Sequence, residues 1–263
     1  MAEERVRYES HGGVAQIVLA RPARANAVDL PTVQAFAVAV DKAFAADIRA
    51  VIVRGEGERF CAGGDLKAMA DAVDRPAYLE ELANAFDRAL QKLATLPKPV
   101  IAAVQGSVAG AGIAVMLSCD LVVSAASTRF LTAYSTVGLT PDCGISFLLP
   151  RAIGLPRALE LALTGRTLSG EEAKQWGLVN EVVEDELLEA RAQELGNQLA
   201  AGPTWALGQA KQLMRDWQAS REQMGRKEAL TIADAVTRAD AKVIQSFATS
   251  KTLEGRPDHD ALV

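Results

Sequence analysis

Short apolar, β-branched runs recur along the first half of the chain, and each is followed by a turn that contains Gly, Pro or Ala. These runs predict strands at Val14–Leu19, Ala50–Arg54, Val100–Val104 and Leu121–Ser124. Helical patterns lie between them at Pro31–Ala45, Tyr78–Leu96 and Gly112–Leu117. The first two are amphipathic, whereas the third is apolar all round, as a buried helix is. Strands that alternate with helices predict an α/β fold.

From Pro156 onward the pattern becomes mainly helical. A helix is predicted at Pro156–Thr164, with Pro at its first position and Gly165 at its end, and Ser169 with Glu172 has the form of a capping box. A last short strand is predicted at Val179–Val183. Three further helices are predicted at about Asp185–Ala201, Pro203–Trp217 and Ser220–Phe247. We therefore predict an α/β core over residues 1–200 and a helical region over residues 201–263 that packs against another surface.

Composition places the chain among ordinary folded proteins. Its 263 residues are 49% hydrophobic and 23% charged, which excludes intrinsic disorder. The formal net charge of −5 argues against a protein that holds nucleic acid by neutralising phosphates. Three cysteines and two histidines lack metal-ligand spacing, so no metal site is expected and a reducing compartment is favoured. The first ten residues contain no apolar segment, which predicts a cytoplasmic location.

One uncharged stretch, Pro99–Cys119, is long enough to be compared with a membrane span. Polar side chains at Gln105, Ser107 and Ser118 interrupt it, and three glycines break its local order. A buried strand, a turn and a helix fit the pattern better. No membrane partner is therefore predicted.

Glycines cluster between Gly106 and Gly112, directly after a predicted strand. Interpreted as a dinucleotide fingerprint from Gly110, the motif has Val115 where a third small residue is required, and no acidic residue follows near Ser124. Two interpretations remain. The glycines allow a strand and a helix to pack closely, or they expose backbone N–H groups at a helix start to an anion or a carbonyl oxygen.

A second loop of this kind, Phe60–Leu66, follows the strand that ends near Arg54. Its Gly-Gly-Asp sequence is also ordinary turn chemistry before a helix, with Asp65 as the N-cap. Two such loops, each after a strand, can direct one N–H apiece at the same point. That arrangement would form an oxyanion hole.

In this order, six stretches of the chain carry a specific resemblance to one family. They are Arg21–Ala27, Phe60–Leu66, Pro97–Gly106, Gly110–Asp120, Gly138–Asp142 and Leu163–Asn180. The chain resembles the crotonase (enoyl-CoA hydratase/isomerase) superfamily over almost its whole length. The resemblance implies a spiral core of repeated ββα units, a helical C-terminal trimerisation region and an acyl-coenzyme A thioester as substrate.

The resemblance also assigns site residues. It implies that the backbone amides of Gly64 and Ala111 hold the thioester oxygen. It implies substrate contacts from the residues around that oxygen and near the coenzyme, which are Arg24, Ala25, Ala27, Ala62, Asp65, Leu66, Tyr134 and Lys251. No metal or redox cofactor is implied, since coenzyme A is part of the substrate.

The side chains that differ among family members indicate the reaction. Hydratases of this family use two glutamates to activate water, and the matching positions here are Ala114 and Tyr134, which carry no carboxylate. Asp142 stands where several members carry their working acid, in a Gly-Leu-Thr-Pro-Asp-Cys-Gly stretch similar to ring-acyl-CoA isomerases of phenylacetate degradation. Without the resemblance, an Asp after Pro and before Cys-Gly is typical of a turn.

These residues favour an isomerase that moves a carbon–carbon double bond through an enolate, with Asp142 carrying the proton. Hydration of a 2-enoyl-CoA is the enzymatic alternative, and acyl-CoA binding without turnover is the non-enzymatic one. Chlorobenzoyl-CoA dehalogenases are also similar, but their histidine base aligns near Asp87. Apolar positions in the last helices, such as Leu207, Leu213, Leu230 and Ile244, predict trimers that can pair into hexamers.

Overall fold

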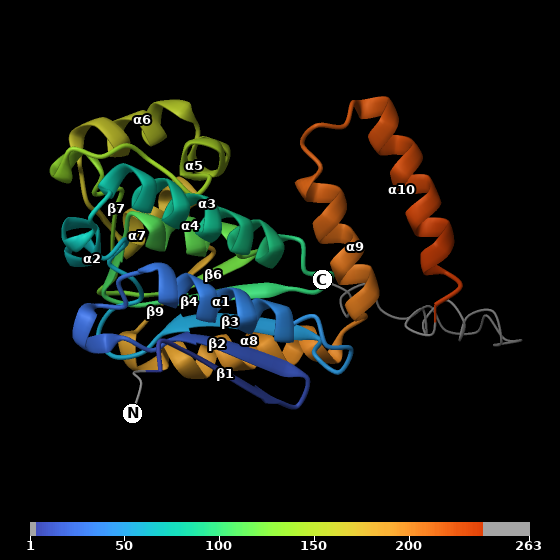
Figure 1. The fold of residues 1–263 in the computed structure, drawn as a ribbon. Coiled ribbons are helices and arrows are strands. Elements are labelled where there is room, and N and C mark those ends of the chain that lie inside the picture. Colours follow the sequence, from blue (N-terminus) through green and yellow to red (C-terminus); the bar gives the residue numbers. More distant parts are fainter. Residues whose placement is uncertain (1–3, 239–263) are drawn as a thin grey trace, which may run out of the picture. The chain divides into compact units, whose positions relative to one another are not determined.

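A six-stranded sheet forms the centre of the computed structural model, which describes residues 4–238. The strands lie in the order β1-β2-β3-β4-β6-β9 (Figure 1). Their bounds are β1 Val6–His11, β2 Val14–Leu19, β3 Ala50–Gly55, β4 Val100–Val104, β6 Leu121–Ala125 and β9 Glu181–Val183. β1 pairs antiparallel with β2 across a Gly12-Gly13 turn, and each later neighbour is parallel. The predicted strands are confirmed to within one or two residues at each end.

Helices cover both faces of this sheet. α1 (Leu30–Lys42), α3 (Arg75–Ala94) and α4 (Ala111–Ser118) lie on one face, and α8 (Leu188–Ala201) lies on the other (Figure 1). Alternate strand residues divide accordingly: Val51 and Val53 join the core under α1 and α3, while Ala50 and Ile52 join the core under α8. This is the two-sided burial that near-continuous apolar strands predict.

A second, three-stranded sheet lies beside the first and consists of β5 (Ser107–Ala109), β7 (Arg129–Leu131) and β8 (Leu168–Ser169). The sequence pattern did not predict these strands, because each has only two or three residues and shows no periodicity. The other helical segments of the first 187 residues are short. They are η1 Pro22–Arg24, α2 Leu66–Asp71, η2 Ser135–Val137, α5 Ile145–Ile153, α6 Leu155–Thr164, α7 Gly170–Trp176 and η3 Asp185–Leu187. The capping box of Ser169 and Glu172 is confirmed at the start of α7.

Local sequence explains several boundaries that differ from the predictions. α3 begins at Arg75 rather than Tyr78, because the Asp74 carboxylate accepts a hydrogen bond from the Ala77 N–H and caps the helix. α1 ends at Lys42 rather than Ala45. The Pro99–Cys119 stretch forms the predicted strand β4 and helix α4, and the segment between them, predicted as a turn, also contains the short strand β5. Within residues 4–238, no helix is long and apolar enough to cross a membrane.

Two compact units share the chain, residues 1–211 and residues 212–263. α9 (Thr204–Arg215) runs across this division, and α10 (Arg221–Ala235) belongs to the second unit. On α10 the side chains of Leu230 and Ile232 are largely exposed. Ile244 and the predicted helical residues 239–247 lie outside the described residues. A helical region from residue 201 that forms trimers or hexamers stays a prediction.

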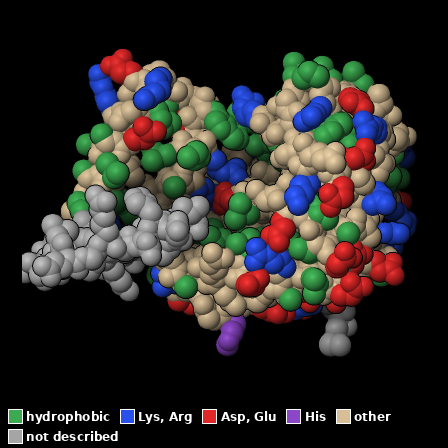
Figure 2. Space-filling view, turned by 180° about the vertical axis from the view of Figure 1, so that it is seen from behind, with side chains coloured by type: hydrophobic (Ala, Val, Ile, Leu, Met, Phe, Trp, Pro, Cys, Tyr) green, Lys and Arg blue, Asp and Glu red, His purple; other side chains and the backbone are tan. Residues whose placement is uncertain are grey.

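Charged side chains of both signs are interspersed on the face of the molecule shown in Figure 2. That distribution agrees with the modest net charge of −5. A surface that gathers one sign into a continuous field would be expected of a protein that binds a polyphosphate backbone.

Candidate active site

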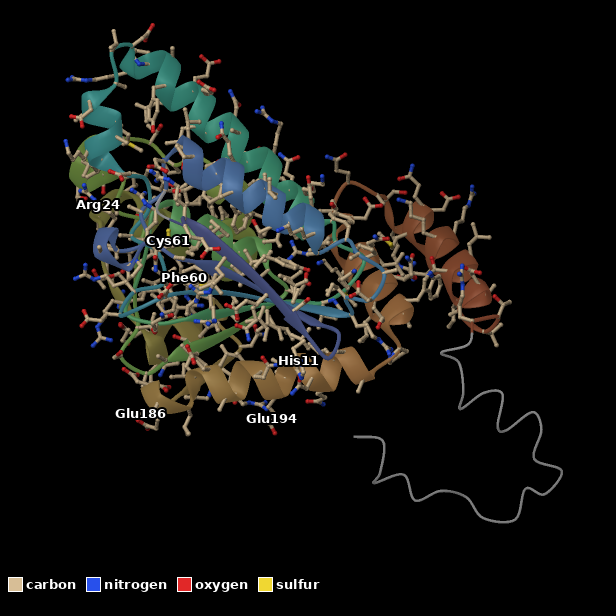
Figure 3. The ribbon with its side chains drawn as sticks, turned by 60° about the horizontal axis from the view of Figure 1, so that its bottom comes forward. His11, Arg24, Phe60, Cys61, Glu186 and Glu194 are labelled. Carbon is tan, nitrogen blue, oxygen red and sulfur yellow. The ribbon has the colours of Figure 1, made fainter. Side chains whose placement is uncertain are left out.

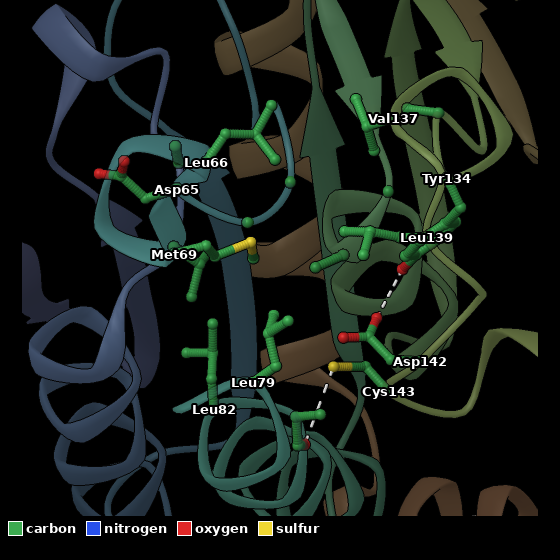
Figure 4. Close-up of a pocket in the computed structure, with 18 of the residues that line it drawn as sticks. Asp65, Leu66, Met69, Leu79, Leu82, Tyr134, Val137, Leu139, Asp142 and Cys143 are labelled. Carbon is green, nitrogen blue, oxygen red and sulfur yellow. Dashed lines mark hydrogen bonds between the residues drawn. The ribbon is translucent and has the colours of Figure 1, made fainter. Parts of the chain in front are cut away.

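A cavity of about 550 Å³ lies in the first unit, bounded by two glycine-containing loops, by α2 and α3, and by the segment between β7 and α5. Its lining is mainly apolar, and it includes both residues predicted to supply backbone amides. The predicted acid, Asp142, also lines it (Figure 4). We call residues 60–65 and 106–111 the backbone wall, and residues 132–143 the side-chain wall. Gly64 and Ala111 belong to the first, and Tyr134 and Asp142 belong to the second.

Main-chain hydrogen bonds join the two loops of the backbone wall. The Cys61 N–H donates to the Ser107 carbonyl over 3.2 Å, and the Ala109 N–H donates to the Cys61 carbonyl over 2.9 Å. A Cβ built on Gly63 would lie 3.6 Å from the Ala111 nitrogen. The two loops therefore meet at the cavity, as the two strand-to-loop patterns predicted.

The backbone geometry explains why these two amides can serve a ligand. Ala111 begins α4, and the N–H groups of a first helical turn have no acceptor within the helix. Gly64 pairs with Val28 through its neighbours: the Val28 N–H donates to the Gly63 carbonyl, and the Asp65 N–H donates to the Val28 carbonyl. Because amides alternate in direction along an extended segment, the Gly64 N–H faces away from Val28. Both groups are suited to an oxyanion hole.

On the side-chain wall, the Tyr134 hydroxyl donates a hydrogen bond of 2.6 Å to Asp142 Oδ1. Tyr134 stands just before η2, and Asp142 follows Pro141 ahead of α5. Burial, together with the adjacent Asp142 carboxylate, raises the pKa of Tyr134 far above its ordinary value. The phenol therefore remains a donor at neutral pH. This contact is with another side chain, unlike the contact to neighbouring backbone that a simple turn-forming Asp makes.

Cys143 is next to Asp142 in an unusual conformation, with φ at +51°. Its thiol lies 4.0 Å from the Ala83 carbonyl oxygen, to which it donates. Burial first, and then the Asp142 carboxylate, raise the pKa of Cys143. The thiol is thus held in its protonated form, is a poor nucleophile and packs as a small buried hydrophobe.

Several predicted contact residues line the cavity. Ala27, Ala62 and Leu66 are among them, and Arg24 is exposed at its rim (Figure 3). Ala25 does not line the cavity; its carbonyl instead accepts from the Ala62 N–H and braces the backbone wall. Lys251 lies outside the described residues. Substrate contact by these residues stays a prediction.

Asp65 lines the cavity but is committed to structural contacts. Its Oδ1 accepts from the backbone N–H groups of Lys67 and Ala68, so it caps α2 as the turn interpretation predicted. Its Oδ2 lies 3.2 Å from the guanidinium of Arg21. In Figure 4 the carboxylate points away from Asp142.

Part of the apolar lining, mainly from α3, was not identified from the sequence. Leu79, Leu82 and Phe86 line the cavity from α3, and Met69 lines it from α2. The spacing of the three α3 residues, at i, i+3 and i+7, is that of one helix face and is the signal from which they could have been found. From the side-chain wall, Val137 and Leu139 contribute further apolar surface while remaining partly exposed.

Carboxylates line the cavity at Asp65, Glu80 and Asp142. Asp65 is engaged by Arg21, and Glu80 is exposed to solvent. Ala114, at the first hydratase position, is fully buried on α4. In the part of the chain that the structure describes, no group of three or more His, Cys, Asp or Glu side chains could hold a metal ion. Asp142 is therefore the best-placed acid–base group of the cavity.

Comparison with known proteins identifies the family of the chain. The family model for enoyl-CoA hydratase/isomerase matches residues 9–253. The chain belongs to the enoyl-CoA hydratase/isomerase family. It is 42% identical over 205 residues to 1,2-epoxyphenylacetyl-CoA isomerase from Escherichia coli K12, which covers 76% of this chain and 78% of that protein.

Two further relatives show how the family varies in reaction. A trans-2-decenoyl-[acyl-carrier-protein] isomerase from Streptococcus mutans is 36% identical, over 81% of each chain. The crystal structure of an enoyl-CoA hydratase from Polaromonas sp. JS666 is 32% identical, covers 92% of this chain and 96% of its own, and has a TM-score of 0.87. The fold class is confirmed as the crotonase type, and both isomerases and hydratases share it.

Proposed function

We propose that the protein is an acyl-CoA isomerase that moves a carbon–carbon double bond in an enoyl-CoA or ring-acyl-CoA thioester. The observation that carries the proposal is the position of Asp142, a carboxylate in an apolar cavity that also contains the Gly64 and Ala111 amides. The two positions at which hydratases carry glutamates are Ala114 and Tyr134. One carboxylate can transfer a proton between two carbons, whereas the hydratase route uses a pair.

The proton moves in two steps. Asp142 removes a proton from a carbon next to the acyl double bond, and the electron pair of the broken C–H bond passes into an enolate on the thioester oxygen. The amides of Gly64 and Ala111 stabilise that oxygen, and one such donor contributes about 2.7–4 kcal/mol. Asp142 then returns the proton to a different carbon as the electron pair reforms a C=C bond. The overall change is an isomerisation, with no gain or loss of atoms.

The relatives support this choice among the family's reactions. The relative with 42% identity is a 1,2-epoxyphenylacetyl-CoA isomerase, and the Streptococcus relative is a trans-2-decenoyl-[acyl-carrier-protein] isomerase. Hydration remains the alternative reaction. Thioester binding without turnover would need the amides but not Asp142.

A substrate screen tests the proposal. Purified enzyme is incubated with 2-enoyl-, 3-enoyl- and ring-epoxide-CoA thioesters in deuterated water, and mass spectrometry follows water addition and deuterium incorporation. We expect double-bond movement in the enoyl-CoA thioesters with little water addition, and we expect deuterium to enter the acyl group. Hydration as the dominant reaction would overturn the proposal, and no change in any thioester would favour the binding protein.

Asp142→Asn identifies the base in the same assay. The amide keeps the size of the side chain but cannot accept the proton, so turnover and deuterium exchange should fall by about 10²–10⁴-fold. Thioester affinity should change little, because the amides are intact. The matched control is Asp41→Asn on α1, where Asp41 forms an exposed ion pair with Lys92 of α3. This variant should behave as wild type. Wild-type exchange in Asp142→Asn would exclude Asp142 as the base.

A further inference from the structure

Building on the proposed function, we infer that Tyr134 is a positioning residue: its hydroxyl holds Asp142 Oδ1 and so directs the other carboxylate oxygen, Oδ2, toward the substrate. The inference starts from the 2.6 Å hydrogen bond between these side chains. In Figure 4, Oδ2 points away from Tyr134, toward the side of the cavity where Met69 lies. Tyr134 thus takes part in the reaction through Asp142, beyond any contact with the acyl group.

The tyrosine is held at both of its ends. Its backbone carbonyl accepts hydrogen bonds from the Val137 and Leu139 N–H groups, over 3.1 and 3.0 Å. Its ring lies against the backbone wall, because a Cβ built on Gly110 would be 3.9 Å from Tyr134 Cζ. The residue is 9% exposed. A ring fixed in this way gives its hydroxyl one direction, and Asp142 lies in that direction.

The direction of the hydrogen bond also favours the ionised carboxylate. Tyr134 donates, and a donor to a carboxylate stabilises the charged form. The raised pKa of Tyr134 means that the phenol does not lose this proton at neutral pH, so Tyr134 does not serve as the base. The tyrosine proton is neither consumed nor released when Asp142 takes up the substrate proton.

The other titratable groups around Asp142 make this donor important. Within its own segment, Asp142 is flanked by the Cys143 thiol. The neighbouring titratable groups on α3 are acidic. Asp87 Oδ1 lies 3.5 Å from the position of a Cβ on Gly144, and Glu80 lines the same cavity. Arg24 is the basic residue among those lining the cavity, and it is exposed at the rim. Acidic neighbours disfavour a second negative charge, whereas the Tyr134 hydroxyl favours it.

Tyr134→Phe tests the inference because it removes the hydroxyl and keeps the ring. Without its partner, Asp142 loses orientation, and hydrogen bonds to charged groups are strong enough for a loss of about 10-fold or more in kcat for deuterium exchange. KM for the thioester should remain near the wild-type value. Tyr8→Phe, the same change on β1 outside the cavity, is the matched control and should leave kcat and KM unchanged.

Site-specific incorporation of 3-fluorotyrosine at position 134 is the second arm. Fluorine makes the phenol a stronger donor while leaving its shape almost the same. The kcat for exchange should then change while KM stays near the wild-type value, because the donor to Asp142 has changed and the space that the ring fills has not. A residue that merely fills space would leave kcat unchanged as well. The 3-fluorotyrosine enzyme also tests the positioning role of Tyr134 if Tyr134→Phe fails to fold.

A double variant distinguishes failure of the positioning role of Tyr134 from failure of the proposed function. In the Asp142→Asn background, Tyr134→Phe should reduce exchange no further, because the two residues act as one unit. If Asp142→Asn abolishes exchange while both Tyr134 variants keep the wild-type kcat and KM, the positioning role is wrong and the proposed function stands. If Asp142→Asn exchanges at the wild-type rate, the proposed function itself is wrong.

Discussion

The two walls of the cavity are built in different ways. The backbone wall, residues 60–65 and 106–111, is held by main-chain hydrogen bonds between its loops and from Ala25 and Val28. The side-chain wall, residues 132–143, presents the hydrogen-bonded side chains of Tyr134 and Asp142. Its tip, at Val137 and Leu139, is partly exposed. The first wall presents peptide groups, which every sequence of this fold possesses. The second presents side chains, which single substitutions replace.

This difference suggests a division of labour. In the proposed reaction, support for the thioester oxygen depends on the fold, because amides at fixed positions need only the correct backbone path. The choice of reaction depends on which acids and donors line the opposite wall. Relatives that share the fold but are isomerases or a hydratase agree with that division. If the backbone wall is rigid and the tip of the side-chain wall is tolerant, substitutions in the two walls should differ in their cost to stability.

The largest effect is expected for Gly106→Ala in the backbone wall. Gly106 has φ at +59°, and a Cβ there would lie 2.0 Å from the Glu58 carbonyl oxygen. The left-handed conformation costs about 1–2 kcal/mol and forced overpacking about 1–3 kcal/mol, so the free energy of unfolding should fall by about 2–5 kcal/mol. Urea denaturation of the two proteins measures this difference. A loss below about 1 kcal/mol would show that the 58–60 segment moves easily.

Much of this scaffold can be predicted from sequence, for physical reasons. Strands β2 and β4 are long apolar runs buried on both faces, and their bounds agree with the predicted ones. The glycines that bring the two loops together are visible as a cluster after each strand. The capping residues Asp65 and Ser169 identify the starts of α2 and α7. These signals are local, so they can be interpreted without knowing the tertiary contacts.

The side-chain wall is less predictable because its contacts are not local. Asp142 and Tyr134 were each singled out by the resemblance, but nothing in the sequence shows that the phenol donates to the carboxylate. The same is true of Leu79, Leu82 and Phe86, whose helix spacing indicates a buried face but not the cavity that it lines. The strands β5, β7 and β8 are short enough that only their pairing defines them.

An intermediate effect is expected from pH, through Cys61 in the backbone wall. Burial raises the pKa of Cys61 from its ordinary 9.0 to about 11. Between these values the unfolded chain releases the thiol proton and the folded protein keeps it, so stability falls as pH rises from about 9 to 11. The contribution is about 2–3 kcal/mol over that window.

The test compares wild type with Cys61→Ala, which removes the titrating group. Urea denaturation at pH 8, 9, 10 and 11 should show a steeper loss of stability in wild type, by about 2–3 kcal/mol in total. Equal slopes in the two proteins would mean that the folded thiol ionises like an unfolded one. In that case the backbone wall would admit solvent to Cys61, contrary to its full burial.

The smallest effect is expected for Gly138→Ala at the tip of the side-chain wall. Gly138 has φ at +71°, similar to that of Gly106, but a Cβ there would meet no atom within 4 Å. Only the conformational cost then applies, so the free energy of unfolding should fall by about 1–2 kcal/mol. Because Gly138 is followed by Leu139 rather than by the reacting groups, deuterium exchange at saturating thioester should stay within about a factor of three of wild type. Gly106→Ala and Gly138→Ala thus share one conformational cost and differ in crowding, and urea denaturation of both isolates that difference. Equal losses in the two variants would show that contact with Glu58 adds nothing, and the contrast between a tightly packed backbone wall and an open loop tip would be wrong.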